Sequence, residues 1–202
     1  MHVILLGDSI FDNGSYTRGE PDVVTHLREL LPRSHTATLL AVDGAVVANV
    51  SAQLRRVPVD ATHLVISAGG NDALGNTDLL ALPVQSTTEA LEIFRKRSEV
   101  FEKEYVAMVG TALRAKKPVT LCTIYNGNLP PAEARIALLL FNDVILRTAV
   151  AHALPVIELR LVCTEPSDYA NPIEPSGRGG RKIAQAIVRS LEAATIATRV
   201  VI

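Results

Sequence analysis

The amino-acid sequence places a serine directly after an apolar run near its beginning. Residues 3–14 read VILLGDSIFDNG, so the apolar residues stop at Gly7 and small polar residues follow. Ser9 therefore stands where a buried strand is expected to end. A serine hydroxyl is a weak nucleophile until a neighbouring base takes its proton. If Ser9 attacks a substrate as a nucleophile, another residue of the chain has to act as its base.

Glycine, amide and carboxylate groups follow the other apolar, β-branched runs as well. Asp43 and Gly44 come after the second run, GGND at 69–72 after the third, NGN at 126–128 after the fourth, and a long loop, 160–175, after the fifth. The carboxyl ends of parallel strands meet at one edge of a sheet, where ligands bind. We therefore expect these groups to lie together with Ser9.

The elements that must position these groups alternate between short strands and longer helices. We predict strands over 2–6, 36–42, 62–68, 118–125 and 155–159, and helices over 21–31, 45–55, 87–116, 131–153 and 176–193. Pro21 and Pro131 suit first-turn positions, Ser176 suits an N-cap, and Gly110 is a candidate kink. This alternation predicts an α/β protein, a parallel sheet with helices on both faces, in one domain over residues 1–202.

Three stretches in this order resemble the SGNH, or GDSL-type, hydrolases. They are GDSIFDNG at 7–14, VDGAVVAN at 42–49 and SAGGND at 67–72. The resemblance covers nearly the whole chain and implies a flavodoxin-like three-layer fold with strand order 2-1-3-4-5. Members of the family are esterases, lipases, thioesterases and carbohydrate deacetylases. The implied substrate is a small-molecule ester or acylated compound, with no cofactor and no metal.

By this resemblance Ser9 is the nucleophile. The N–H groups of Ser9 and Gly44 and the side chain of Asn71 are the implied oxyanion hole, whose fixed donors stabilise the charge that acyl transfer develops on a carbonyl oxygen. The candidate substrate-binding residues beside them are Asp8, Asp12, Asp72 and Asn171.

The last block of the family, Asp-x-x-His-Pro before the final helix, differs in this chain. The matching stretch is NPIEPSGRGGRKIA at 171–184, with Asn171 where the Asp is expected and Glu174 where the His is expected. None of the five histidines replaces the missing one. His35, His63 and His152 precede strands, His2 begins one, and His26 lies within the first helix.

Glu174 is the direct candidate for the base. An ordinary glutamate, with a pKa of about 4.3, is a poor base for an alcohol, but burial or a nearby carboxylate raises that pKa. We consider Asp12, Asp72 and Asp168 as such neighbours, and Asn171 as a hydrogen-bond donor that orients Glu174. Two interpretations remain open: a serine ester hydrolase or acyltransferase with Glu174 in place of His, and an inactive protein that binds a small ligand or partner in the same pocket.

Composition excludes several other classes of protein. The net charge of −1 gives no general attraction to nucleic acid. No apolar stretch reaches the roughly 18 residues of a membrane span, and the N-terminus lacks a signal pattern, so we expect a cytoplasmic protein. The two cysteines, Cys122 and Cys163, form no CxxC pair, and we expect reduced thiols. GRGGRK at 177–182 lacks P-loop spacing, and no metal-ligand spacing is present.

Overall fold

A five-stranded parallel sheet lies at the centre of the computed structural model, which describes residues 1–129 and 132–192. The strand order is β2-β1-β3-β4-β5, as the sequence predicts. The strands are β1 (His2–Gly7), β2 (Thr36–Leu39), β3 (His63–Ser67), β4 (Val119–Cys122) and β5 (Val156–Ile157). Each lies within or beside its predicted range. The parallel order brings the carboxyl ends of all five strands to the same edge.

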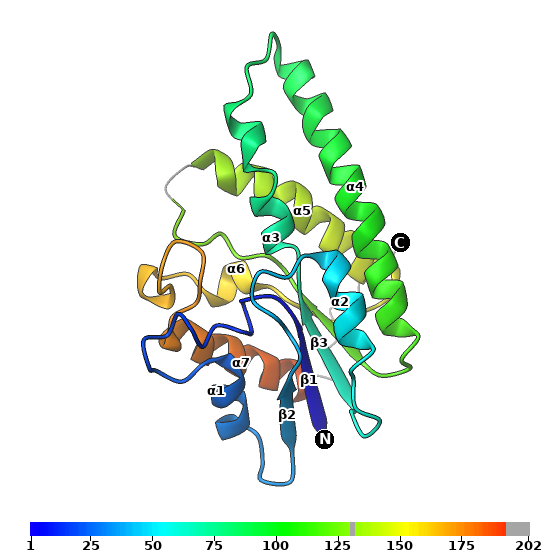
Figure 1. Ribbon diagram of the computed structural model, residues 1–202, viewed down its shortest axis with the longest axis vertical. Helices are drawn as coiled ribbons and strands as arrows, with labels where there is room; N and C mark the ends of the chain where they lie inside the picture. The colour runs from blue at the N-terminus through cyan, green and yellow to red at the C-terminus, as the bar shows by residue number, and fades with distance from the viewer. Residues whose placement is uncertain (130–131, 193–202) are drawn as a thin grey trace.

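Helices cover both faces of this sheet and complete a three-layer sandwich (Figure 1). One face packs against α1 (Val23–Leu30), α6 (Leu159–Val162) and α7 (Gly177–Glu192), and the other packs against α2 (Val47–Leu54), α4 (Thr87–Leu113) and α5 (Ala132–Ala151). The shorter helices α3 (Gly70–Leu74), η1 (Thr77–Ala81) and η2 (Pro166–Asp168) lie in the loops after the strands.

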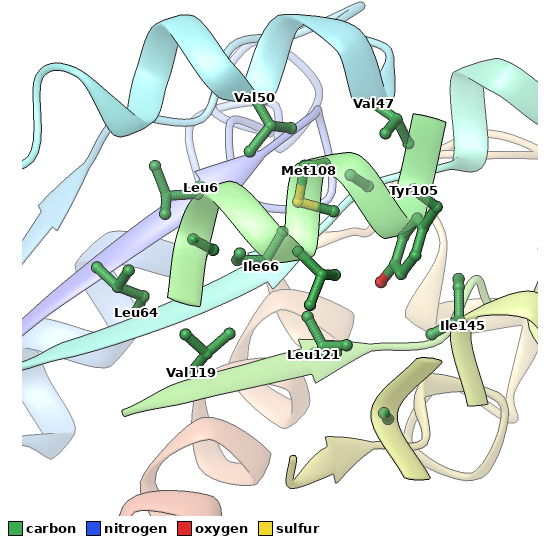
Figure 2. Packing of buried hydrophobic residues seen from close by; sticks show 14 of the residues in the cluster. Leu6, Val47, Val50, Leu64, Ile66, Tyr105, Met108, Val119, Leu121 and Ile145 are labelled. Carbon is green, nitrogen blue, oxygen red and sulfur yellow. The ribbon is translucent and has the colours of Figure 1, made fainter. Parts of the chain in front are cut away.

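The alternation of side chains along β1 explains why the core has two halves. Val3 and Leu5 belong to the cluster under α1 and α7, whereas Ile4 and Leu6 belong to the cluster under α2, α4 and α5. Successive residues of a strand point to opposite faces, so an unbroken apolar run buries both. Figure 2 shows the second cluster, where strand side chains meet Tyr105 and Met108 of α4.

Capping residues determine where two of the helices begin. Asp22 is the N-cap of α1 and accepts a hydrogen bond from the Thr25 N–H at 2.9 Å. Pro21 therefore precedes the cap, and its predicted first-turn position is wrong because an Asx cap one residue later starts the helix. Ser176 precedes α7, and its Oγ accepts from the Gly179 N–H at 3.2 Å, so the predicted N-cap is confirmed. The predicted positions of Pro131 and Ala193 lie outside the described residues.

The largest differences from the predicted elements follow β3 and β5. The residues GGND at 69–72 are typical of a turn, but in the structure they begin helix α3. Gly69, with a φ of 118°, is the N-cap of this helix, which starts at Gly70. The loop after β5 contains α6 and η2, which the sequence did not predict. Gly110 lies within the continuous helix α4.

The segment from η1 through the first half of α4 projects beyond the rest of the molecule (Figure 1). Together with α5 it extends the α2, α4, α5 layer past the carboxyl edge of the sheet. Within the described ranges, no helix combines the length and apolar character that crossing a membrane requires. Cys122 and Cys163 are both buried free thiols.

Candidate active site

Ser9 is held in a sharp turn at the end of β1. Gly7 has a φ of 125°, and a Cβ at this position would lie 1.7 Å from the Ser67 carbonyl oxygen, so only glycine fits between β1 and β3. The side-chain amide of Gln53 donates to the Gly7 carbonyl and accepts from the Gly7 N–H, both at 2.7 Å. The Asp8 carbonyl accepts from the Phe11 N–H at 3.1 Å and closes the turn. The nucleophile candidate is therefore fixed by its backbone on both sides.

Glu174 contacts Ser9 directly. The Ser9 Oγ donates a hydrogen bond to Glu174 Oε1 at 3.0 Å, and both residues are buried, 7% and 5% exposed. Glu174 comes from the loop before α7, so the bond joins the first strand to the last part of the chain. Geometrically, this is the contact that a nucleophile and its base require.

Asn171 positions Glu174 differently from our expectation. Its Oδ1 accepts hydrogen bonds from the N–H groups of Ile173 and Glu174, each at 2.9 Å. The expected donation from the Asn171 amide to the Glu174 carboxylate is absent among the described contacts, because the side chain is engaged in this local turn. Asn171 thus orients the main chain that carries the carboxylate.

The surroundings of Glu174 favour its neutral form more than water does. Burial raises its pKa to about 7, the hydrogen bond from Ser9 opposes this, and the negative charge of Asp43 adds to the increase. Within the described residues, Glu174 Oε2 is buried without a hydrogen-bond partner. A carboxyl group with this pKa is half ionised near neutral pH, which suits proton transfer.

The acidic neighbours differ from those considered from the sequence. Asp43, which the sequence placed at the same sheet edge but which we did not consider as a neighbour of Glu174, influences Glu174, and Asp8 is a further neighbour. Asp168 is buried elsewhere, where Lys182 Nζ lies 2.6 Å from it and Arg178 Nε 3.5 Å. The position of Asp43 directly before Gly44, after β2, is the sequence signal that could have found it.

The expected oxyanion donors line two different hollows. Asn71 lines the same pocket as Ser9, and its Nδ2 donates to the Ala45 carbonyl at 3.0 Å. Gly44, with a φ of 77°, lines a separate hollow together with Asp43 and Ala45. The structure therefore brings Ser9, Asn71 and Glu174 to one pocket and leaves Gly44 beside it.

Two of the expected substrate-binding carboxylates are engaged with backbone N–H groups and do not line the pocket. Asp12 Oδ2 accepts from the Asp43 N–H at 2.9 Å, and Asp72 Oδ2 accepts from the Val47 N–H at 3.1 Å, at the start of α2. Asn171 does not line the pocket either, whereas Asp8 does. Asp12 and Asp72 thus hold the loops that surround Ser9.

The pocket at Ser9 is mostly apolar and extends away from the sheet toward the projecting helices. Its empty space, including the open mouth, is about 980 Å³. Its apolar walls come from α3, η1, α4 and α5 and include Leu74, Leu79, Phe94, Ala137, Leu138 and Phe141. Tyr125, which the sequence analysis assigned to no site, lines it and donates its hydroxyl to the Ile173 carbonyl. This shape and lining suit an apolar group bound next to Ser9.

No histidine lines this pocket among the described residues. His26, the most buried of those discussed above, has its Nε2 3.0 Å from the Gly177 carbonyl oxygen, between α1 and α7. Over the same described ranges, no three His, Cys, Asp or Glu side chains are grouped to hold a metal ion. Among the described side chains, the titratable group hydrogen-bonded to Ser9 Oγ is therefore the carboxyl group of Glu174.

Solved structures with the same fold cover nearly all of this chain. A lipolytic protein of the G-D-S-L family from Veillonella parvula superimposes with a TM-score of 0.70 at 19% identity, covering 96% of this chain and 98% of its own. A lipase from a goat rumen metagenome gives 0.73 at 19% identity, with 94% and 97% covered. An acetyl xylan esterase variant from Geobacillus stearothermophilus gives 0.71 at 16% identity, with 94% of each chain covered.

Comparison of the sequence with known proteins gives two results. A search of curated proteins found no match. The profile of one family, described as GDSL-like Lipase/Acylhydrolase, matches residues 5–182. This range contains the end of β1 and Ser9 after it, α3 with Asn71, and the loop with Glu174. Since the match spans most of the 202 residues, the chain belongs to the GDSL-like lipase/acylhydrolase family.

Proposed function

We propose that this protein hydrolyses esters of small molecules, with Ser9 as nucleophile and Glu174 as general base. One observation carries the proposal: the 3.0 Å hydrogen bond that Ser9 Oγ donates to Glu174 Oε1 at the mouth of an apolar pocket. Membership of an acylhydrolase family supports the same reaction class.

In the acylation step, Ser9 Oγ attacks the carbonyl carbon of the ester. Its proton moves to Glu174 Oε1 along the existing hydrogen bond, so a new carbon–oxygen bond forms and negative charge develops on the carbonyl oxygen. When this intermediate collapses, the bond to the alcohol breaks and Glu174 returns the proton to the leaving oxygen. Glu174 thereby acts first as base and then as acid.

The developing oxyanion requires fixed hydrogen-bond donors. In this proposal they are the N–H groups of Ser9 and Gly44 and the Asn71 amide. One N–H of the Asn71 amide donates to the Ala45 carbonyl at 3.0 Å. The amide nitrogen carries a second N–H, which can donate to the substrate oxygen while the first keeps the Ala45 carbonyl and holds the side chain in place.

The acyl group occupies the apolar pocket, and the alcohol leaves toward solvent. The pocket walls from η1, α4 and α5 offer an aliphatic chain contact on several sides. Removing each methylene from water contributes about 0.8 kcal/mol to binding, so a chain of several carbons binds better than acetate. A water molecule, activated by Glu174 in the same way as Ser9, then hydrolyses the acyl-enzyme.

The proposal is tested with p-nitrophenyl esters of increasing acyl length and with a fluorophosphonate that reacts with activated serines. We expect turnover and one covalent adduct at Ser9, detected by mass spectrometry. Both should be lost in Ser9→Ala and retained in Ser190→Ala, which changes a serine on α7 whose hydroxyl donates to the Ile187 carbonyl and which does not line the pocket.

The alternative, a binding protein with the same pocket, predicts a different pattern. If the wild type neither turns over any ester nor reacts with the fluorophosphonate, while fatty acids still bind in the pocket, the chain binds ligands without hydrolysing them. Turnover that persists in Ser9→Ala would exclude Ser9 as the nucleophile.

A further inference from the structure

Asp8 is a second buried carboxyl group in the pocket, and the proposed reaction does not use it. It directly precedes Ser9, is 2% exposed and lines the same pocket as Ser9 and Glu174. One of its oxygens, Oδ1, accepts a hydrogen bond from the Ile10 N–H at 3.1 Å. A carboxyl group is rarely buried this deeply without a paired cation.

The charged groups facing Asp8 and Glu174 are acidic. Asp8 is influenced by Glu174 and Asp72, and Glu174 by Asp43. Tyr125 and Cys122 also lie near Asp8, and burial raises the pKa of both, so they are neutral. Within the described residues, neither Asp8 nor Glu174 forms an ion pair; Arg97, which lines the pocket, lies 3.3 Å from Asp78.

Two neighbouring carboxyl groups in such surroundings ionise one after the other. Burial raises the pKa of Asp8 to about 7, and the charges of Glu174 and Asp72 add to this, despite the opposing hydrogen bond from Ile10. When one group of the pair is ionised, its charge disfavours ionisation of the other, so the two protons leave in separate steps. Between these steps the pair holds a single proton.

The position of the Ser9 hydroxyl decides which group keeps that proton. Ser9 donates to Glu174 Oε1 and stabilises a negative charge there. Asp8, which lies deeper and faces two acidic neighbours, keeps the proton. This arrangement leaves Glu174 able to accept the serine proton without a second charge close to the oxyanion.

We propose that Asp8 is a positioning residue that holds the proton shared with Glu174, so that the site works only while the pair is singly protonated. The inference rests on the proposed function for its kinetic consequence. With both groups protonated, Glu174 cannot accept the Ser9 proton. With both ionised, the Asp8 charge repels the oxyanion that forms at the adjacent residue.

The kinetic test compares kcat/KM against pH for the wild type and Asp8→Asn, with circular dichroism and thermal unfolding to verify folding. We expect a bell-shaped profile for the wild type. Asp8→Asn should keep the acid limb of this profile, because residue 8 is neutral at low pH in both proteins. It should lose the alkaline limb, because asparagine does not ionise. An unchanged bell in Asp8→Asn, or a uniform loss of rate with the same shape, would overturn the proposal.

Asp43→Asn serves as the matched control, because Asp43 acts on Glu174 from the solvent side. Removing its charge should move the acid limb to lower pH and leave the alkaline limb in place. An alkaline limb that disappears in Asp43→Asn as well would show that loss of any nearby charge has the same effect, which contradicts a specific role for Asp8.

A measurement independent of turnover separates this inference from the proposed function. In Ser9→Ala protein labelled with ¹³C at its carboxyl groups, NMR should show Asp8 and Glu174 titrating together in two steps, and Glu174 in one step after Asp8→Asn is added. Asp8 titrating alone, near its ordinary pKa, would overturn the inference even if esters are hydrolysed. Joint titration in a protein that hydrolyses no ester would support the shared proton and overturn the proposed function.

Discussion

A carboxylate beside a nucleophilic serine has a different charge balance from an imidazole. An imidazole becomes a cation when it takes the serine proton, and a paired aspartate stabilises that cation. In the proposed reaction Glu174 becomes neutral in the same step, so no cation forms that a paired aspartate would have to stabilise. The presence of Asn171, whose Oδ1 holds the Glu174 main chain, fits this balance.

The Glu174→Gln variant tests the base while keeping its size. Glutamine retains an oxygen that accepts the Ser9 hydrogen bond but cannot take the proton. We expect kcat/KM for activated esters to fall by about 10²–10⁴, the usual contribution of general-base catalysis. Steady-state kinetics measure this, with Glu133→Gln, an exposed glutamate of α5, as the control that keeps the rate. Wild-type activity in Glu174→Gln would show that another group takes the proton.

The sequence predicted that Glu174 lies next to Ser9 and that burial raises its pKa, but not which carboxylate contributes to that increase. Glu174 occupies a definite place in the last block, ahead of a helix start that Ser176 marks. Its raised pKa depends on burial under loops from other parts of the chain and on Asp43, which a linear pattern does not place. Similarly, the sequence predicted Asp8 as a substrate-binding residue, and only the folded chain shows that it is buried in the same pocket as Glu174.

At the scale of elements, four of the five strands end at or shortly before a glycine with a positive φ, namely Gly7, Gly44, Gly69 and Gly127. Gly7 is the strictest example, since the Ser67 carbonyl occupies the space that a side chain would need. Apolar runs were enough to locate all five strands. Helix α3 was not predicted because two successive glycines normally favour a turn. Only the folded chain shows that Gly69 lies close to Phe101 of α4 and to Ile124, where there is little room for a side chain.

Two glycine-to-alanine variants should have opposite effects on stability. In Gly7→Ala the added Cβ collides with a backbone carbonyl and the φ of 125° is strained, so we expect a loss of about 3 kcal/mol or more. Gly110→Ala lies in α4 with open space around the added atom, and should stabilise by about 0.5–1 kcal/mol. Urea unfolding measures both; a neutral Gly7→Ala would contradict the packing of β1 against β3.

At the scale of the whole molecule, the projecting segment of η1 and α4 lines the pocket beside Ser9. The sheet and its turns supply the reacting groups, whereas the apolar walls come from helices beyond the sheet edge. The strand pattern predicted that the polar groups gather at the edge of the sheet. It did not predict the apolar walls, because the wall residues of α4 and α5 are indistinguishable in sequence from ordinary core positions.

Filling this pocket should shift the preference for acyl length. In Ala137→Phe the larger side chain occupies part of the space against α5, so esters with long chains lose contact while acetate esters are less affected. We expect the ratio of kcat/KM for octanoate over acetate to fall by about tenfold, equivalent to about 1.4 kcal/mol. An unchanged ratio in a folded variant would place the acyl chain elsewhere.

The buried acids should also make the stability of the whole fold depend on pH. The pKa of Asp8 is raised from 3.8 to about 7 on folding, so the folded state binds more protons than the unfolded state between these values. The resulting contribution is present below the unfolded pKa and is lost as pH rises through the folded one. Asp8→Asn lacks this titration.

We therefore expect Asp8→Asn to gain stability relative to the wild type as pH rises from about 4 to about 8, by about 2–4 kcal/mol. Guanidinium unfolding at both pH values gives the difference. If the difference in unfolding free energy between Asp8→Asn and the wild type stays constant with pH, the Asp8 carboxyl titrates equally in the folded and unfolded chain.

The bond between Ser9 and Glu174 joins a residue of the first loop to one that precedes the last described helix, and Asn13 donates to the Pro175 carbonyl at 3.1 Å across the same junction. Because a chain is synthesised from its N-terminus, Ser9 leaves the ribosome well before Glu174. In the reaction proposed above, a nascent or truncated chain without residues 171–175 carries Ser9 without its base, so we expect reactivity only after this loop has docked.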